Sequence, residues 1–332
     1  MRQRYWLWAS IPIFSVIFWL FISEREVDLP DSYVGKDVAV ILAAIPKRDR
    51  ERLEYFFLES IRRDCFGYVL LGKKPMAWGG LTTAINPFAC FWEKDAGTIV
   101  TVDGYEPHLH EKFLWHLQQA LSSQRMRSNR AYQTWRRYEK FFPMSRFSII
   151  YENNYHDGCD ELSIVLINRK AFIQTVRENI QDFTKILGRD VDPEKLLQEA
   201  EHKPLFSDIL MNHDGLIGTL LGYGRENAFW FHQKYRMHLE EERNVFRQVF
   251  QLQFALTDEF SGPWTDREDA NCCSLSDDPS GLDDVLLPGF RANFSSDETQ
   301  SLRTQYLETR QTILNYYQGK DFLETTLDLL RN

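Results

Sequence analysis

The spacing of apolar residues is most regular between Pro204 and Phe231, where it predicts a helix, a glycine turn and the start of a second helix. Six apolar residues share one face of the first helix, at spacings of three and four: Leu205, Ile209, Leu216, Ile217, Leu220 and Leu221. Gly222 and Gly224 should supply the left-handed backbone that ends such a helix. We expect this helical hairpin, whose second helix covers about 225–256, to be the core on which the other elements pack.

Further helices are predicted where apolar residues recur with the same periodicity. These stretches are 47–63, 107–122, 125–142, 169–187 and 193–201, then a helix opened by a capping box at Ser295–Glu298 and ended by Gly319, and a last short helix to about Leu330. Strands are predicted over 67–71, 98–102, 146–151 and 161–167, with the last two joined as a hairpin. The run 38–45 fits a helix or a strand, and 78–92 is expected to be β-rich or irregular.

The order of these elements favours an α+β fold over alternating strand–helix units, because helices alone follow the last predicted strand. We therefore expect a mainly helical domain with a small antiparallel sheet, spanning residues 37–332 as one unit. A hydrophobic content of 43% is sufficient for a large core at this length. Residues 257–293 are rich in Asp, Gly, Pro and Ser, which predicts a mobile acidic surface loop.

The N-terminal region contains an uncharged run from Tyr5 to Ile22 that is long enough, at its lower limit, for one transmembrane helix. A cleaved signal peptide is the competing interpretation, but no small-residue cleavage site follows the run. We expect an uncleaved membrane anchor over residues 1–23 and a polar tether over 24–36. Arg2 and Arg4 precede the run, so the positive-inside rule favours a cytoplasmic N-terminus and a periplasmic or otherwise extracytoplasmic body.

The net charge of −9 makes bulk electrostatic binding of nucleic acid unfavourable. One basic and aromatic stretch, within the helix predicted over 125–142, could still contact acidic lipids or RNA, although a solvated helix face is the commoner meaning of such a pattern. The five cysteines lack zinc-site spacing, so scattered thiols are expected, with one or two disulfides if the compartment is oxidising. They are Cys65, Cys90, Cys159, Cys272 and Cys273.

Three short segments carry a resemblance to a known group of proteins. They are FGYVLLGKKPM at Phe66–Met76, LINRKAF at Leu166–Phe172 and LGYGRENA at Leu221–Ala228. Together with the aromatic helix predicted before the first of them, they resemble an uncharacterised group of singly membrane-anchored proteins from chlamydia-like intracellular bacteria. The resemblance covers about half of the chain and implies a bacterial source and membrane association, but no activity and no catalytic residue.

The His213–Asp214 doublet is the strongest candidate for chemistry, because metal-dependent phosphohydrolases of the HD type use such a pair as metal ligands. Further ligands would have to come from His202, Asp208 or Glu226. The apolar pattern runs through the doublet, which places it in the middle of a helix and makes it a weak chelator. We therefore predict no metal ligand here, with His213 and Asp214 as ligands only in the alternative, hydrolase interpretation.

Other motifs have simpler explanations. Gly222–Ala228 is similar to a dinucleotide-binding fingerprint, but a predicted helix precedes it where the fingerprint requires a strand, so a helix-ending turn is favoured. His108 and His110 do not share a helix face, and His156–Asp160 fits a hairpin turn better than a nucleophilic cysteine site. The sequence thus predicts a membrane-anchored, non-enzymatic interaction or envelope-associated protein with an unknown protein partner and without a cofactor; the alternative is the metal-dependent hydrolase.

Overall fold

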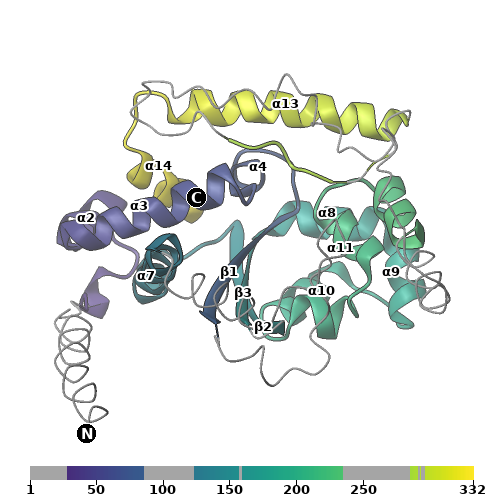
Figure 1. Cartoon of the computed structure of the whole chain (residues 1–332), viewed down its shortest axis with the longest axis horizontal. Coiled ribbons are helices and arrows are strands. Elements are labelled where there is room, and N and C mark those ends of the chain that lie inside the picture. The colour runs from purple at the N-terminus through teal and green to yellow at the C-terminus, as the bar shows by residue number, and fades with distance from the viewer. Residues whose placement is uncertain (1–27, 86–122, 157–158, 235–284, 291, 293–295) are drawn as a thin grey trace, which may run out of the picture.

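The computed structural model describes residues 28–85, 123–156, 159–234, 285–290, 292 and 296–332 (Figure 1). Within these residues the fold is mainly helical with one small antiparallel sheet, as predicted from the order of elements. No helix in the described part of the chain has both the length and the apolar character needed to cross a bilayer. The predicted anchor Tyr5–Ile22, strand 98–102, helix 107–122 and most of the loop 257–293 lie outside the described residues.

The sheet contains three strands in the order β1-β3-β2, with every neighbouring pair antiparallel. The strands are β1 (Met76–Ile85), β2 (Phe147–His156) and β3 (Cys159–Asn168). The hairpin predicted from 146–151 and 161–167 is confirmed, because β2 pairs with β3 from Phe147 opposite Asn168 to His156 opposite Cys159. The predicted β-rich character of 78–92 is confirmed over the part that β1 covers.

The N-terminal helices form one side of the domain. They are η1 (Asp31–Tyr33), α2 (Val38–Ala44), α3 (Lys47–Arg62), α4 (Phe66–Leu70), α7 (Ser123–Tyr138) and η2 (Glu139–Phe141). The amphipathic pattern over 47–63 is confirmed, since α3 buries the apolar face that includes Leu53, Phe57 and Ile61. The strand predicted over 67–71 is wrong: these residues belong largely to α4, which is buried on all sides, so hydrophobic periodicity carried no information there.

The helices that follow the sheet form the other side. They are α8 (Arg169–Glu178), α9 (Ile180–Leu187), α10 (Pro193–Ala200), η3 (Leu205–Ile209) and α11 (Asp214–Leu220). The single helix predicted over 169–187 is two helices, because the chain turns at Asn179, whose side chain donates to the carbonyl of Thr175. Asp192 caps α10 as its sequence predicts, by accepting a hydrogen bond from the amide of Lys195.

The helix predicted before Gly222 is also divided. Met211 and Asn212 both have positive φ, at 54° and 51°, which stops the helical path between η3 and α11. His213 is therefore the N-cap of α11 and not a mid-helix residue, so the sequence-based placement of the doublet was wrong. The glycine turn is confirmed, with φ of 75° at Gly222 and 86° at Gly224, and a helix restarts at 225 and is described to 234.

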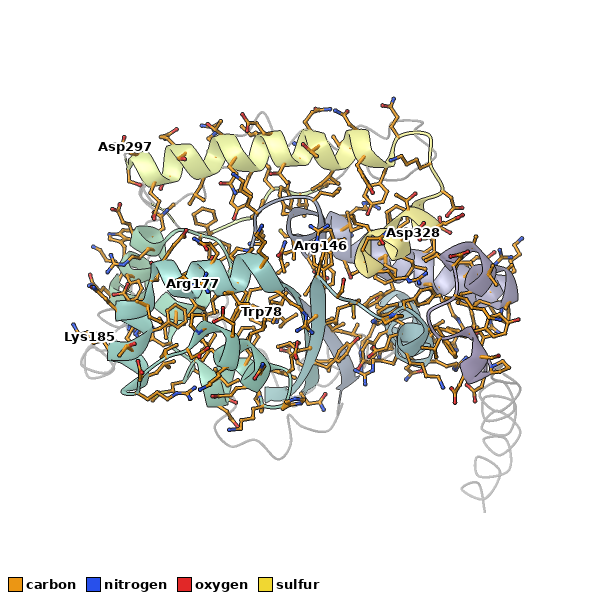
Figure 2. All side chains as sticks on the ribbon, turned by 180° about the vertical axis from the view of Figure 1, so that it is seen from behind. Trp78, Arg146, Arg177, Lys185, Asp297 and Asp328 are labelled. Carbon is orange, nitrogen blue, oxygen red and sulfur yellow. The ribbon has the colours of Figure 1, made fainter. Side chains whose placement is uncertain are left out.

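The C-terminal helices are α13 (Asp297–Tyr317) and α14 (Phe322–Arg331). The predicted end of α13 is confirmed, since Gly319 takes a positive φ after it. The helix begins where predicted, but the Ser295–Glu298 capping box was wrong: Ser296 is the cap and accepts from the amide of Thr299. Figure 1 shows α13 lying across the other helices from α4 to the region of α11. In Figure 2 its first residue, Asp297, lies over the helices that follow the sheet, while Asp328 of α14 lies on the opposite side of the domain.

Two hydrophobic clusters, one on each face of the sheet, make up the core of the described residues. Alternate residues of β3 point into different clusters: Ile164 and Leu166 into the first, Val165 and Ile167 into the second. The first cluster joins α2, α3, α4, α7 and α14 and is the larger. The hairpin around Leu216 and Leu220 belongs to the second, so the expectation that all other elements pack on this hairpin was wrong.

Candidate functional site

The His213–Asp214 doublet lies at the N-terminus of α11, and the fold adds a third polar residue to it. The ring of His232, from the helix that begins at 225, stacks on the ring of His213 with centroids 3.9 Å apart. His232 Nδ1 lies 3.2 Å from the Asp214 carboxylate. His213 Nδ1 accepts the hydrogen bond of the Leu216 amide and so caps the helix. Each of these groups therefore has a structural partner.

This arrangement is poorly suited to a shared metal ion. A metal binds an imidazole nitrogen in the plane of the ring, but the stacked rings of His213 and His232 are inclined by only 30° and cannot both aim at one nearby point. The other proposed ligands, His202, Asp208 and Glu226, are exposed. Among the described residues no group of three or more His, Cys, Asp or Glu side chains is arranged to hold a metal.

The glycine turn after α11 is filled by contacts from distant segments. The ammonium of Lys74 donates to the carbonyl of Leu221 and lies over the ring of Tyr223, 4.8 Å from its centroid. Burial lowers the pKa of Lys74 to about 8. The hydroxyl of Tyr306 donates to the carbonyl of Gly222 at 2.6 Å. These contacts satisfy the carbonyls at a helix end, which is a structural role.

The N-terminus of the helix that begins at 225 is likewise occupied. The carboxylate of Glu298, from the first turn of α13, accepts hydrogen bonds from the amides of Glu226 and Asn227 at 3.3 and 3.2 Å. A carboxylate thus fills the position that a phosphate would take in a dinucleotide-binding turn. The element before the turn is a helix, as the sequence predicted, so the fingerprint interpretation lacks its structural context.

The aromatic residues of α7 and some of its basic residues make contacts inside the fold. Trp135 and Tyr138 are fully buried, and the Tyr138 hydroxyl donates to the carboxylate of Asp49 on α3 at 2.9 Å. Arg137 forms an ion pair with the same carboxylate, and the guanidinium of Arg136 lies 3.9 Å from the centre of the Tyr151 ring. The aromatic side chains thus lie inside the fold, whereas Arg127, Arg130 and Arg136 are exposed, as expected for the solvated helix face that the sequence favoured.

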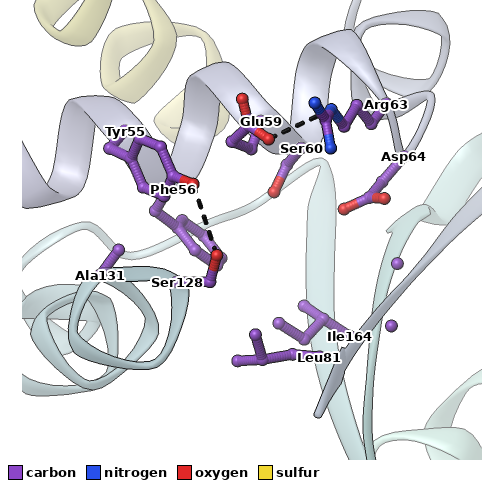
Figure 3. A pocket seen from close by; sticks show the side chains of 12 residues that line it. Tyr55, Phe56, Glu59, Ser60, Arg63, Asp64, Leu81, Ser128, Ala131 and Ile164 are labelled. Atoms are coloured by element: carbon purple, nitrogen blue, oxygen red, sulfur yellow. Dashed lines mark hydrogen bonds and ion pairs between the residues drawn. The ribbon is translucent and has the colours of Figure 1, made fainter. Parts of the chain in front are cut away.

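A pocket of about 190 Å³ opens between α3, α7 and the sheet, at a place that the sequence did not indicate (Figure 3). Its lining is mixed, and Figure 3 shows how it is divided: α3 and the following residues contribute the charged groups, whereas β1 and β3 contribute Leu81 and Ile164. Two interactions frame it. Arg63 Nε lies 3.2 Å from the carboxylate of Glu59, and the hydroxyls of Tyr55 and Ser128 are 3.5 Å apart.

The carboxyl group of Asp64 is the distinctive group of this pocket. It accepts no hydrogen bond from another described residue, and burial raises its pKa to about 7, with a further upward contribution from Glu59 and an opposing one from Arg63. The carboxyl also lies against Gly79 of β1, where an added Cβ would overlap it. A partly buried carboxyl with a shifted pKa inside a pocket is typical of functional sites.

No protein-family model, no curated protein and no solved structure matches this chain. The resemblance to the chlamydia-like membrane-anchored group therefore stays a prediction.

Sequence reasoning missed both His232 and Asp64 for physical reasons. His232 lies 18 residues after Asp214 and reaches it only because the glycine turn folds one helix back on the other. Asp64 is close to charged neighbours in the sequence and looks like an ordinary helix-end residue. The available signal was Gly79–Gly80 inside a strand, since glycines there often mark a close approach of another group. The side chains of His156, Cys159 and Asp160 lie outside the described residues, and Cys65 is a free thiol.

Proposed function

We propose that this protein is a membrane-anchored, non-enzymatic interaction or envelope-associated module whose folded domain is held against the membrane surface. The observation that carries the proposal is the attachment of residues 28–36 to the domain. The uncharged run Tyr5–Ile22 inserts in the bilayer, with the N-terminus in the cytoplasm and the domain on the periplasmic or extracytoplasmic side. An unidentified protein of that compartment is the proposed partner.

The attachment uses both ends of the domain. Leu29 is buried, and Asp31 of η1 forms an ion pair with Lys140 at 2.8 Å. The guanidinium of Arg331, in the last turn of α14, donates to the carbonyls of Lys36 and Gly35 at 2.7 and 3.0 Å. Only residues 23–27 then remain between the proposed anchor and the attached segment, a reach of roughly 20 Å even when fully extended. The face that carries η1 is therefore the proposed membrane-proximal face.

The geometry around the doublet supports the non-enzymatic part of the proposal. His213 serves as a helix cap and Asp214 as a partner of His232, so both side chains have structural tasks. The N-terminus of the helix that begins at 225, where an anionic ligand could bind, is occupied by the carboxylate of Glu298. These contacts account for the most suggestive motifs of the chain without a substrate.

The anchor can be tested in isolated membranes that contain the full-length chain. We expect the protein to pellet with the membranes and to resist both carbonate and high-salt washing. Phe14→Arg/Phe18→Arg should release it, because each arginine costs about 2.5–3.5 kcal/mol at the centre of a membrane helix. Leu307→Arg, at an exposed position of α13, is the matched control and should stay in the pellet. Release of the unaltered chain by salt alone would exclude the anchor.

The metal-dependent hydrolase has one observation in its favour, which is that the fold brings His232 to the His213–Asp214 doublet. Metal analysis of the purified full chain in detergent separates the two functions. If the protein is a non-enzymatic module, it should contain no stoichiometric transition metal and hydrolyse no phosphoester. His213→Ala should then change stability alone. About one equivalent of metal, lost in a folded His213→Ala variant, would instead establish the hydrolase.

A further inference from the structure

The pocket between α3, α7 and the sheet carries an inference that goes beyond the proposed module. We propose that it is a binding site for a small organic cation of the primary-amine class, whose ammonium group pairs with the carboxylate of Asp64. The size of the pocket, about 190 Å³, is comparable with the roughly 150 Å³ cavity that holds one benzene ring. The ligand is therefore a molecule of about that bulk.

Charge decides in favour of a cation. The pocket contains two carboxyl groups, Glu59 and Asp64, and one guanidinium, Arg63. Arg63 is already paired with Glu59 at 3.2 Å, so it offers little free charge to an anionic ligand. The Asp64 carboxylate forms no ion pair with a described residue, although the guanidinium of Arg63 favours its charge from a distance. An ammonium group placed beside it would supply the missing partner and up to three hydrogen-bond donors.

The remaining walls suit the organic part of such a ligand. Phe56 on α3 is mostly buried, and with Leu81 and Ile164 it offers an apolar surface to a ring or a short alkyl chain. The hydroxyls of Ser60 and Ser128 lie in the same lining and can bond to a polar substituent. Figure 3 shows Asp64 on the side of the pocket nearer the strands, with the Tyr55–Ser128 pair across from it.

Two neighbouring glycines of β1 shape the pocket differently. A Cβ on Gly79 would overlap the Asp64 carboxyl, so a glycine at this position is what allows the carboxyl to lie against the strand. A Cβ on Gly80 would meet nothing within 4 Å. The two positions are adjacent on one strand and thus form a matched pair for testing whether the placement of Asp64 matters.

Binding should depend on pH, because the ammonium group requires the ionised carboxyl. Among the described residues of the lining, the charged groups that face Asp64 are Glu59 and Arg63, and the Tyr55 hydroxyl is the other titratable group. The described residues that β1, β3 and α7 add to the lining are not titratable. With the pKa of Asp64 raised to about 7, most of the carboxyl is protonated at pH 5.5 and ionised at pH 8. Affinity for an amine should fall at least tenfold from pH 8 to pH 5.5.

The test uses the full chain in detergent and three probes of similar shape: benzylamine, benzyl alcohol and benzoate. Saturation-transfer NMR and calorimetry at pH 8 should show binding of benzylamine, with at least tenfold weaker binding of the other two. Asp64→Asn and Gly79→Ala should each weaken benzylamine binding at least tenfold. Gly80→Ala and Asp190→Asn, which alters an exposed carboxylate elsewhere, should leave it unchanged.

Three results would overturn the proposal: no binding of benzylamine at pH 8, equal binding of benzyl alcohol or benzoate, or undiminished benzylamine binding in folded Asp64→Asn. If Asp64→Asn does not fold, the pH dependence of the unaltered chain decides, since affinity that stays constant between pH 5.5 and pH 8 also excludes the Asp64 carboxylate. None of these readouts depends on the membrane anchor, so the two proposals can fail separately.

Discussion

The two sides of the sheet are built in different ways. The second cluster is assembled almost entirely from one continuous stretch, 150–221, to which β1 adds Met76, and it is mostly aliphatic. The first joins segments from both ends of the described chain, as the bond between Arg331 and Lys36 illustrates, and it is rich in aromatic rings, with Trp135 stacked between Phe56 and Phe142. Long-range contacts close large loops, so the first cluster should form later and more cooperatively than the second.

The largest expected effects come from cavities placed in each cluster. Trp135→Ala should lower the free energy of unfolding by about 3–5 kcal/mol, because Trp135 is fully buried and its ring nitrogen donates to Tyr151. Leu220→Ala in the second cluster should cost about 2–5 kcal/mol.

Hydrogen exchange of the two variants would sharpen the comparison. Trp135→Ala should reduce amide protection in both clusters, whereas Leu220→Ala should reduce it mainly in α8 to α11. Equal loss of protection everywhere in both variants would show that the clusters are one cooperative unit. An unchanged melting temperature in both would mean that neither residue belongs to the core.

A side chain added at Gly222 should destabilise the fold more than one added at a turn glycine that has open space around it. Gly222→Val should cost about 1–3 kcal/mol, because a β-branched residue is strained at φ of 75° and its Cβ would lie 2.7 Å from the Tyr306 hydroxyl. Gly188→Ala, at φ of 64° with nothing within 4 Å, isolates the cost of the backbone alone. Denaturant titration should show a larger loss for Gly222→Val, and a smaller one would mean that Tyr306 does not constrain the turn.

Stability should rise between pH 7 and pH 9 because of Lys74. Its pKa is lowered to about 8 in the folded state, so the unfolded chain binds more protons above that pH, and raising the pH favours folding. The gain from this group is about 1 kcal/mol over the interval. Lys74→Met should abolish the rise in denaturant titrations at the two pH values. The same slope in this variant would assign the effect to another group.

The smallest effect is expected at the exposed ion pair between Arg225 and Asp182, where Arg225 Nε lies 2.5 Å from the carboxylate. Arg225→Ala should change stability by less than about 1 kcal/mol, because solvent screens such pairs. Salt at 0.5 M screens charges over roughly 4–5 Å, so it should reduce the difference in stability between Arg225→Ala and the unaltered chain. Thermal unfolding with and without the salt measures this. If Arg225→Ala lowers the free energy of unfolding more than Gly188→Ala does, the ion pair between α9 and the helix after the turn contributes more to stability than an exposed pair should.

The elements that the sequence predicted correctly are those with local causes. The face of α3, the cap of α10, the hairpin of β2 and β3 and the positive φ of Gly222 each follow from residues a few positions apart. The failures have non-local causes. Residues 66–70 are buried on all sides, between α3, α13 and the strands β1 and β3, and burial of every residue removes the periodic signal.

The candidate site was harder to predict than the fold. Met211 and Asn212 adopt positive φ although neither is glycine. The helix is therefore interrupted before His213, which is the N-cap of α11 and not the mid-helix residue that the sequence predicted. The pocket around Asp64 needs α3, α7 and two strands in place before its unpaired carboxyl can be recognised. No motif encodes such a meeting of segments.

The long helix α13 provides contacts to the glycine turn that can form only late in the synthesis of the chain. Tyr306 completes the hydrogen bonding of the turn at Gly222, but it follows that glycine by 84 residues. At a synthesis rate of 5–20 residues per second, the ribosome needs roughly 4–17 seconds to cover that separation. During this time the amides of Glu226 and Asn227 also lack Glu298. A nascent chain is therefore exposed at this turn to proteases and chaperones until its last helices emerge, and the period of vulnerability is set by translation speed.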